Sequence, residues 1–163
     1  MIEIRPATEE DFASMVSIIR AVFDGGDTYP YPPGMDDEEI HHAWIEKTQA
    51  AYVAVEGGEI VGTYYIKANQ PGLGSHVCNA GYIVSSAARG RGVGGAMCAH
   101  SQAEAQKLNF KAMQYNLVAS SNETAVQLWQ RHGFEIVGRL PKAFDHQELG
   151  LVDAYVMYKW LGE

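Results

Sequence analysis

Residues 82–97 read Tyr82-Ile-Val-Ser-Ser-Ala-Ala-Arg-Gly-Arg-Gly-Val-Gly-Gly-Ala-Met97, and this stretch decides the fold. A β-rich run ends at Val84, a glycine-rich turn with two arginines follows, and a helix of small residues begins near Val93. The first N–H groups of a helix have no partner within it, and the aligned peptide dipoles favour negative charge there. Arginines add charge-assisted hydrogen bonds to such a site. The stretch therefore predicts a strand, a phosphate-binding turn and a helix, in that order.

The glycines of this turn fit two templates for phosphate binding. Gly90, Gly92 and Gly95 match G-x-G-x-x-G, the fingerprint of dinucleotide-binding oxidoreductases. That fingerprint follows the first strand of its βαβ unit and precedes an acidic residue by about 20 positions. Here more than half of the chain precedes the turn, and residues 113–118 (MQYNLV) contain no acid. The second template is [QR]-x-x-G-x-[GA], which residues 89–94 (RGRGVG) satisfy and which we favour.

A second motif follows downstream. Residues 121–134 read SNETAVQLWQRHGF and predict a helix with both ends marked. Ser121 or Asn122 can accept a hydrogen bond from a first-turn N–H, and Gly133 stands where a helix ends in a left-handed residue. The pattern N-x-x-A-x-x-L-[YW]-x-x-x-G-F and the turn template [QR]-x-x-G-x-[GA] occur in this order in the GNAT N-acetyltransferases. The chain resembles that family over about residues 1–160.

The resemblance implies the α/β GNAT fold, with a mixed sheet of about six to seven strands, splayed central strands and about four helices. A chain of 163 residues fits one such domain, spanning 1–163. Hydrophobic periodicity and turn residues predict strands at 2–5, 51–55, 60–66, 77–84, 112–118, 134–138 and 154–160, and helices at 12–22, 37–46, 93–107 and 122–132.

The composition of the chain indicates which classes of binding partner are disfavoured. The net charge of −8 disfavours nucleic acid, because phosphate backbones are bound by clustered cations. No apolar run approaches the ~20 residues of a membrane span and no signal peptide opens the chain, so we expect a cytoplasmic protein without membrane contact. Cys78 and Cys98 are expected to be reduced thiols, and no metal is expected, since His41-His42 lacks metal-ligand spacing. The aromatic segment 155–160 is compatible with a homodimer.

The resemblance also implies acetyl-CoA as the cosubstrate. In the family, pantetheine lies between two splayed strands and pairs with backbone groups as an additional strand would. Here Tyr82, Ile83 and Val84 would offer those groups, and Asn122 would reach the pantetheine arm. The pyrophosphate would be held by Arg89, Gly90, Arg91, Gly92, Val93 and Gly94.

Two departures from the family pattern concern proton transfer. Many members carry a tyrosine before x-x-x-G-F that protonates the leaving thiolate, whereas this chain has Trp129, whose indole is no useful acid. Many also carry a glutamate base on the central strand, but residues 76–82 (HVCNAGY) contain no carboxylate. Tyr82 or Tyr115 could supply a phenol as the catalytic acid, and His76 could relay a proton. The non-enzymatic alternative is an acyl-CoA-binding sensor.

Asparagines interrupt both central strands. Asn is disfavoured in strands, and its amide offers two donors and an acceptor without titrating. Asn79 and Asn116 therefore indicate a polar pocket at the splayed gap.

Three segments resemble one branch of the family, the azetidine-2-carboxylate acetyltransferases, which act on the ring nitrogen of small cyclic imino acids. The resemblance implies that Asn79 holds the substrate carboxylate, that Asn116 positions the reacting groups and that Leu117 supplies backbone contacts. The segments are 76–84, 113–118 and 141–146.

Two further segments, 24–34 and 144–151, are expected to wall the acceptor site. Within the first, Tyr29 and Tyr31 either face substrate or cover apolar surface. We therefore expect acetyl transfer to the nitrogen of a small amine or an amino or imino acid. A protein N-terminus, a lysine and a herbicide-like amino acid remain open as acceptors.

Overall fold

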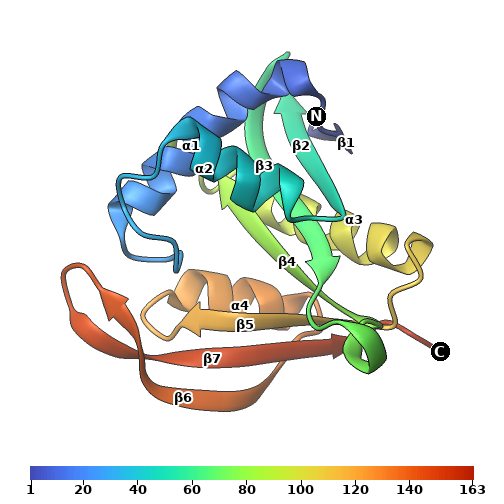
Figure 1. Ribbon diagram of the computed structural model, residues 1–163, viewed down its shortest axis with the longest axis vertical. Coiled ribbons are helices and arrows are strands. Elements are labelled where there is room, and N and C mark those ends of the chain that lie inside the picture. Colours follow the sequence, from blue (N-terminus) through green and yellow to red (C-terminus); the bar gives the residue numbers. More distant parts are fainter.

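The computed structural model describes residues 1–163, and its strands form one seven-stranded mixed sheet in the order β1-β2-β3-β4-β5-β7-β6 (Figure 1). The strands are β1 (Glu3–Pro6), β2 (Ala50–Glu56), β3 (Glu59–Ala68), β4 (Val77–Val84), β5 (Ala112–Ala119), β6 (Glu135–His146) and β7 (Gly150–Trp160). The α-helices are α1 (Phe12–Gly25), α2 (Asp37–His41), α3 (Val93–Lys107) and α4 (Glu123–Arg131). The predicted α/β GNAT architecture is confirmed.

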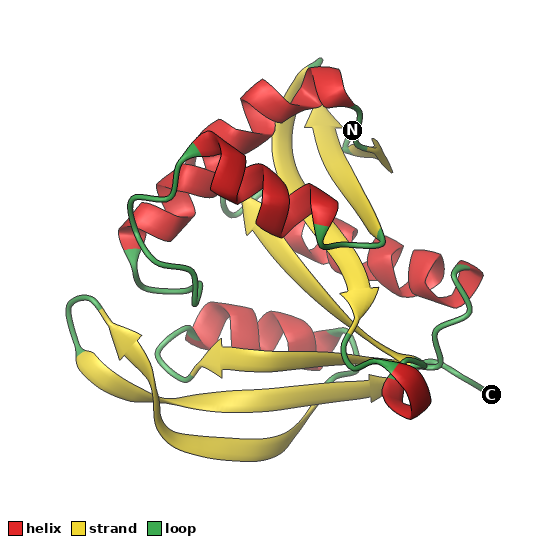
Figure 2. Ribbon diagram, in the orientation of Figure 1, coloured by secondary structure: helices red, strands yellow, loops and turns green.

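Helices cover both faces of the sheet (Figure 2). The face toward α1 and α2 carries a buried cluster that includes Ile19, Trp44 and Tyr65. The opposite face, toward α3 and α4, carries the larger cluster, to which Met97 and Val126 belong. Alternate residues of β4 therefore point into different cores, as the two-residue period of a strand requires.

The chain enters α1 through a partly buried ion pair between Arg5 and Asp11. The Thr8 N–H donates to Asp11 at 2.8 Å, and the Arg5 guanidinium contacts the same carboxylate at 2.7 and 2.9 Å. This arrangement satisfies an N–H that the start of the helix would otherwise leave without a partner. Four residues of α1 are buried, Met15, Val16, Ile19 and Phe23, and the helix is capped by Gly26, whose φ of 63° is left-handed.

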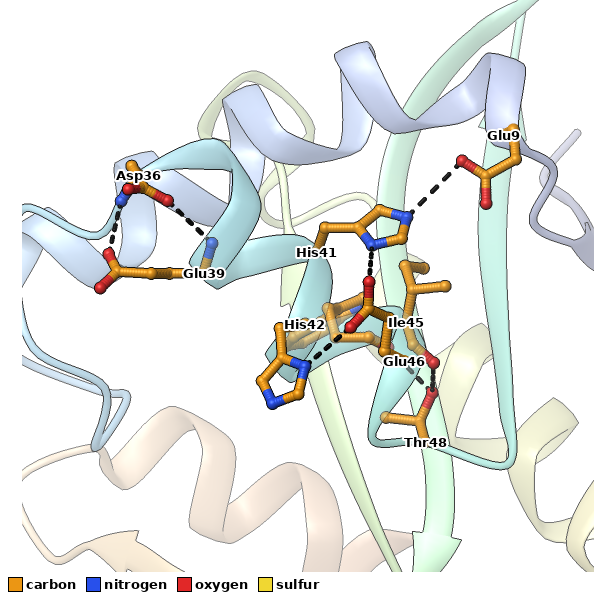
Figure 3. Close-up of polar contacts among 9 residues, drawn as sticks. Glu9, Asp36, Glu39, His41, His42, Ile45, Glu46 and Thr48 are labelled. Carbon is orange, nitrogen blue, oxygen red and sulfur yellow. Dashed lines mark hydrogen bonds and ion pairs between the residues drawn. The ribbon is translucent and has the colours of Figure 1, made fainter.

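The predicted helix at 37–46 is divided. It runs as α2 to His41 and then as a π-helix over His42–Glu46. Figure 3 shows the polar contacts of this segment: His41 Nδ1 lies 3.1 Å and His42 Nδ1 2.7 Å from the Glu46 carboxylate, while His41 Nε2 faces Glu9 at 3.5 Å. The contact between His41 and Glu9 joins α2 to the residues that directly precede α1. No side-chain group here or elsewhere in the chain has the arrangement of a metal site.

The C-terminal hairpin is longer than the sequence indicates. The strands predicted at 134–138 and 154–160 extend to Glu135–His146 and Gly150–Trp160. The pairing of β6 with β7 shifts register between Ile136 and Gly138 and again between Leu140 and Phe144, which hides the alternation by which a strand is recognised. Most of segment 144–151, which is expected to wall the acceptor site, therefore forms the end of this hairpin.

Two further observations concern the cysteines and the hydrophobicity of the helices. Cys78 and Cys98 are buried free thiols, in agreement with the prediction. None of the helices combines the length and apolar character needed to cross a membrane.

Candidate active site

A gap opens in the middle of the sheet between the parallel strands β4 and β5. They pair at only two positions, Val77 with Ala112 and Cys78 with Met113. Beyond Cys78, β4 pairs only with β3 on its other side, as far as Val84. Figure 1 shows the two strands diverging from this point. The edge of β4 that faces β5 is thus left without a strand partner along 79–84.

Asn79 marks the apex of the gap. Its side chain is 8% exposed and donates from Nδ2 to the main-chain oxygen of Gln114 at 2.9 Å. Its Oδ1 accepts from the Tyr65 hydroxyl at 3.3 Å. One Nδ2 hydrogen and one lone pair of Oδ1 remain free, since an amide has two donors and two acceptor sites.

The glycine-rich turn lies at the other end of the unpaired edge of β4. The backbone N–H groups of residues 90–95 form no hydrogen bond within the protein. Gly90 and Gly92 have φ values of 77° and 83°, which residues with a Cβ rarely adopt. Such a run of free N–H groups at the start of α3 is a binding site for anions.

The two arginines of this turn differ in their contacts. Arg91 forms an ion pair with Glu56, the last residue of β2, whereas Arg89 forms none and is exposed. Arg89 is therefore the cation free to meet an anionic ligand.

Asn122 lies at the start of α4 as its N-cap residue. Its Oδ1 accepts from the Ala125 N–H at 3.3 Å, as predicted for one of the two candidates, and its Nδ2 has no partner. The helix ends at Gly133, with φ of 93°. Both predicted helix signals are confirmed.

An aromatic cluster lies on the α3 and α4 side of the gap. The Tyr82 hydroxyl contacts Ser101 Oγ at 2.6 Å and the Tyr115 hydroxyl at 2.9 Å, so the two phenols join the separated strands. Trp129 packs on both rings, with centroid distances of 4.9 and 5.1 Å. Burial raises the pKa of both phenols well above the usual value for tyrosine. The Tyr82 hydroxyl is thus held inside the core and is a weaker acid than a free phenol.

Tyrosines also cover the opposite face of β4, where Gly81 makes room for them. A Cβ at Gly81 would lie 1.8 Å from the Tyr29 oxygen and 2.7 Å from Tyr65 Cε1. Tyr31 stacks on Tyr29, with ring centroids 5.8 Å apart. The predicted residue Tyr29 therefore reaches the central strand, and Tyr31 supports it from the loop side.

The two segments predicted as walls contact each other. The Gln147 N–H, at the tip of the β6–β7 hairpin, donates to the Gly26 carbonyl at 3.0 Å. His146 is buried, and its Nδ1 accepts from the N–H groups of Glu148 and Leu149 at 3.1 Å each. Asp145, like Glu148, is exposed. The hairpin therefore meets the α1–α2 loop.

Asn116 and Leu117 lie at a bulge in β5, between the positions paired with Met157 and Tyr155 of β7. The exposed Asn116 donates to Asn69 Oδ1 at 2.7 Å and accepts from Gln114 Nε2 at 3.0 Å. The half-buried side chain of Leu117 packs against the small buried cluster formed by Ala119, Phe144 and Ala154.

The structure adds residues that the sequence did not reveal. Tyr65, Lys67 and Gln114 all surround Asn79. The signal that could have found Lys67 is a charged residue in the otherwise apolar segment 60–68, placed opposite Asn79 by the antiparallel pairing of β3 with β4.

Known proteins share this arrangement. The family model described as the acetyltransferase (GNAT) family matches residues 13–134. The N-acetyltransferase aca1 of Schizosaccharomyces pombe is 29% identical over 167 residues, which cover 91% of this chain and 79% of that protein. A GCN5-related N-acetyltransferase from Kribbella flavida, 36% identical, superimposes with a TM-score of 0.92 over 98% of this chain and 97% of its own.

A second solved structure is the GNAT superfamily phosphinothricin acetyltransferase (Pat) from Sinorhizobium meliloti, in complex with AcCoA. It is 20% identical, with a TM-score of 0.88 over 99% of this chain and 89% of its own. The seven-stranded sheet with its open centre and the anion-binding turn are features of an acyl-group transferase. The chain belongs to the GNAT family of N-acetyltransferases.

Proposed function

We propose that this enzyme transfers an acetyl group from acetyl-CoA to the nitrogen of a small amine or an amino or imino acid. The observation that carries the proposal is the unpaired edge of β4, which leads directly to the free N–H groups of residues 90–95. The edge of β4 offers backbone groups for strand pairing, and the turn at its end offers N–H groups for an anion. A ligand that joins an amide-containing arm to a pyrophosphate fits both.

The residues of the gap suit acetyl-CoA. The backbone of Tyr82, Ile83 and Val84 lies on the unpaired edge and would pair with the pantetheine arm. The free amide of Asn122 would reach the same arm from α4. The pyrophosphate would lie on the turn formed by Arg89, Gly90, Arg91, Gly92, Val93 and Gly94.

Acetyl-CoA supplies an activated acetyl thioester: the neutral amine forms a C–N bond to its carbonyl carbon and the C–S bond breaks to release CoA thiolate. The proton that the nitrogen loses balances the charge of that thiolate, so the products are the amide and CoA thiol. The protein would hold the amine nitrogen above the plane of the thioester carbonyl, close to its carbon. A backbone N–H near Ile83 would stabilise the negative charge on the carbonyl oxygen. Tyr82 is held in the core by Ser101 and Tyr115, so we assign it a backbone role and no proton transfer.

The acceptor would enter from the face covered by α1 and α2, where the gap is lined by Asn79 and the tyrosines. Asn79 has one free N–H at the apex, and Tyr29 lies over Gly81 beside it. Asn116 at the β5 bulge would position the reacting groups, and the Leu117 backbone would add contacts. This lining supports a small acceptor of the azetidine-2-carboxylate type.

Thermal unfolding with acetyl-CoA, compared with NAD, tests the cofactor. A ligand at a hundredfold excess over its Kd stabilises the native state by about 2.7 kcal/mol, which raises the melting temperature of a chain of this size by about 5–10 °C. We expect this shift with acetyl-CoA alone. A shift with NAD alone would mean that the turn serves a dinucleotide.

Release of CoA thiol with a panel of acceptors tests the reaction. We expect turnover with azetidine-2-carboxylate or a related amino acid, and little with a peptide N-terminus or a lysine peptide. Tight acetyl-CoA binding without thiol release for any acceptor would favour the sensor, and turnover of peptides alone would assign a protein substrate.

A further inference from the structure

Lys67 occupies an unusual position beside the apex of the gap. It lies on β3 directly opposite Asn79 of β4, so the two side chains share one face of the sheet. The lysine is half-buried, and its Nζ lies 5.3 Å from the centroid of the Tyr65 ring. This contact with the ring face orients the ammonium group beside the gap.

No acidic residue balances this charge. Lys67 takes part in no ion pair and no side-chain hydrogen bond of the structure, although several arginines and Lys107 form ion pairs with Asp or Glu. Burial lowers the pKa of Lys67, and the nearby Lys47 lowers it further. Both effects disfavour the charged form, and no carboxylate offsets them. A half-buried cation of this kind gains stability when an anion binds beside it.

The neighbours of Lys67 are donors without negative charge. Asn79 retains one N–H after its bond to the Gln114 carbonyl. Tyr65 donates its own proton to Asn79, which fixes the amide so that its oxygen faces the tyrosine and its nitrogen faces β5. An ammonium and an amide N–H therefore lie on adjacent strands, on the side from which the acceptor enters.

We propose that Lys67 binds the carboxylate of the acceptor beside Asn79, the residue to which the resemblance already assigns it, and that Lys67 selects acceptors carrying a negative charge. The assignment rests on the proposed function, because it concerns the same gap. It narrows the substrate class to amines with a carboxylate close to the reacting nitrogen. Acceptors whose carboxylate is replaced by an amide, and internal lysines of proteins, leave the Lys67 charge without a partner and are disfavoured.

The test compares matched acceptors on matched variants. Azetidine-2-carboxylate, L-proline and phosphinothricin are each assayed beside the carboxamide made from the same amino acid. The variants are Lys67→Met, which keeps most of the length of the side chain without its charge, and Lys67→Arg, which keeps the charge. Lys111→Met, an exposed lysine outside the gap, is the control for loss of one positive charge.

We expect the wild-type enzyme to prefer the carboxylate of at least one pair by tenfold or more in kcat/KM. Lys67→Met should reduce that preference to less than threefold, mainly through a higher KM for the carboxylate. Lys67→Arg should retain most of it, and Lys111→Met all of it. A preference that survives in Lys67→Met, or a wild-type enzyme that prefers carboxamides, overturns the assignment.

A binding measurement separates this inference from the proposed function. With CoA present, titration of azetidine-2-carboxylate by calorimetry should give heat with the wild type and with Lys111→Met but not with Lys67→Met. Equal binding to wild type and Lys67→Met overturns the role of Lys67 even where no acceptor is turned over. Acetyl-CoA should raise the melting temperature of every variant equally, and absence of that shift in the wild type contradicts the proposed function instead.

Discussion

Asn79 Nδ2 donates to the Gln114 carbonyl oxygen at 2.9 Å, and this bond joins the two central strands at the position where their backbone pairing ends. The side chain of Asn79 thus takes the place of the next backbone hydrogen bond between β4 and β5. Because the amide caps the apex, the gap has a defined inner end, and the free N–H of the same amide faces whatever occupies it. Under the proposed function, one residue would thus link the architecture of the sheet to the recognition of an acceptor.

Replacement of Asn79 separates acceptor binding from cofactor binding. Asn79→Ala removes one charge-assisted hydrogen bond to a carboxylate, so we expect KM for a carboxylate-bearing acceptor to rise about 10- to 100-fold. Asn79→Asp should be worse, because it places a negative charge where the carboxylate binds. Steady-state kinetics and acetyl-CoA titration measure the two effects. Equal weakening of acetyl-CoA and acceptor binding in Asn79→Ala would remove the acceptor role.

The sequence predicts the centre of the fold well, for a physical reason. Local chemistry specifies the turn at 89–94 and the ends of α4: left-handed glycines, a helix cap and a run of free N–H groups act within a few residues of one another. The same holds for both ends of α3, which follows the glycines of the turn, and for the start of α1 at Phe12; α1 runs on to Gly25, three residues beyond its expected end.

The sequence predicts the acceptor face less completely, because that face is made by pairing between strands. Tyr65 becomes part of the site only through its register opposite Gly81, and Lys67 only opposite Asn79. Neither residue carries a local signal of that neighbour. The sequence also fails to predict the length of β6. The pairing of β6 with β7 shifts register and Lys142 has a φ of 52°, so the apolar residues of β6 do not alternate along the strand.

Gly92 offers a test of the anion-binding turn. Its φ is 83° and a Cβ would meet no atom within 4 Å, so Gly92→Ala acts only through the backbone conformation. We expect Kd for acetyl-CoA to rise about tenfold or more as the free N–H groups turn away, an effect of about 1.4 kcal/mol or more. Isothermal titration measures it.

The matched control for Gly92 is Gly72, on the β3–β4 connection. It also has a positive φ, 61°, and open space at its Cβ. Gly72→Ala should cost similar stability and leave acetyl-CoA affinity unchanged. A comparable loss of affinity in both variants would show that general strain, and not the turn, lowers binding.

Gly81 tests the tyrosine cover of β4. Gly81→Ala forces Tyr29 and Tyr65 away from the strand, because the added Cβ falls within 3 Å of both side chains. We expect a rise of several-fold or more in acceptor KM and a lower melting temperature, since overpacking costs about 1–3 kcal/mol. Gly138→Ala on β6, where the nearest atom is 3.8 Å away, is the control and should change neither. Unchanged acceptor KM in Gly81→Ala would exclude these tyrosines from the acceptor site.

A Tyr82→Phe variant would show whether the Tyr82 hydroxyl stabilises the core or transfers a proton in the reaction. Tyr82→Phe removes hydrogen bonds to Ser101 and Tyr115 in the core, so the free energy of unfolding should fall by about 1–2 kcal/mol. Because the raised pKa and the buried position of the hydroxyl disfavour catalysis, kcat should change less than about threefold. Denaturant unfolding and thiol release measure the two quantities. A fall in kcat of a hundredfold with little loss of stability would restore the phenol as the catalytic acid.

The ion pair of Asp11 should make the free energy of unfolding depend on pH. Hydrogen bonds from Arg5, and then from Thr8, hold the pKa of its carboxyl well below the usual range despite burial. A carboxyl whose native pKa is depressed stabilises the fold above its unfolded pKa of about 3.9, and the contribution is lost as pH falls through the native value. Asp11→Asn should therefore cost about 1–2 kcal/mol at pH 7, measured by urea unfolding.

The difference between wild type and Asp11→Asn should then narrow steadily below about pH 4, because protonation of the wild-type carboxyl removes the same charge. Asp37→Asn is the control: that carboxyl also meets an arginine, Arg20, but is 66% exposed, and a solvent-exposed pair contributes little at any pH. A difference for Asp11→Asn that stays constant from pH 7 into the acid range would mean that the carboxylate charge contributes nothing, and that the cost arises from altered packing at the start of α1.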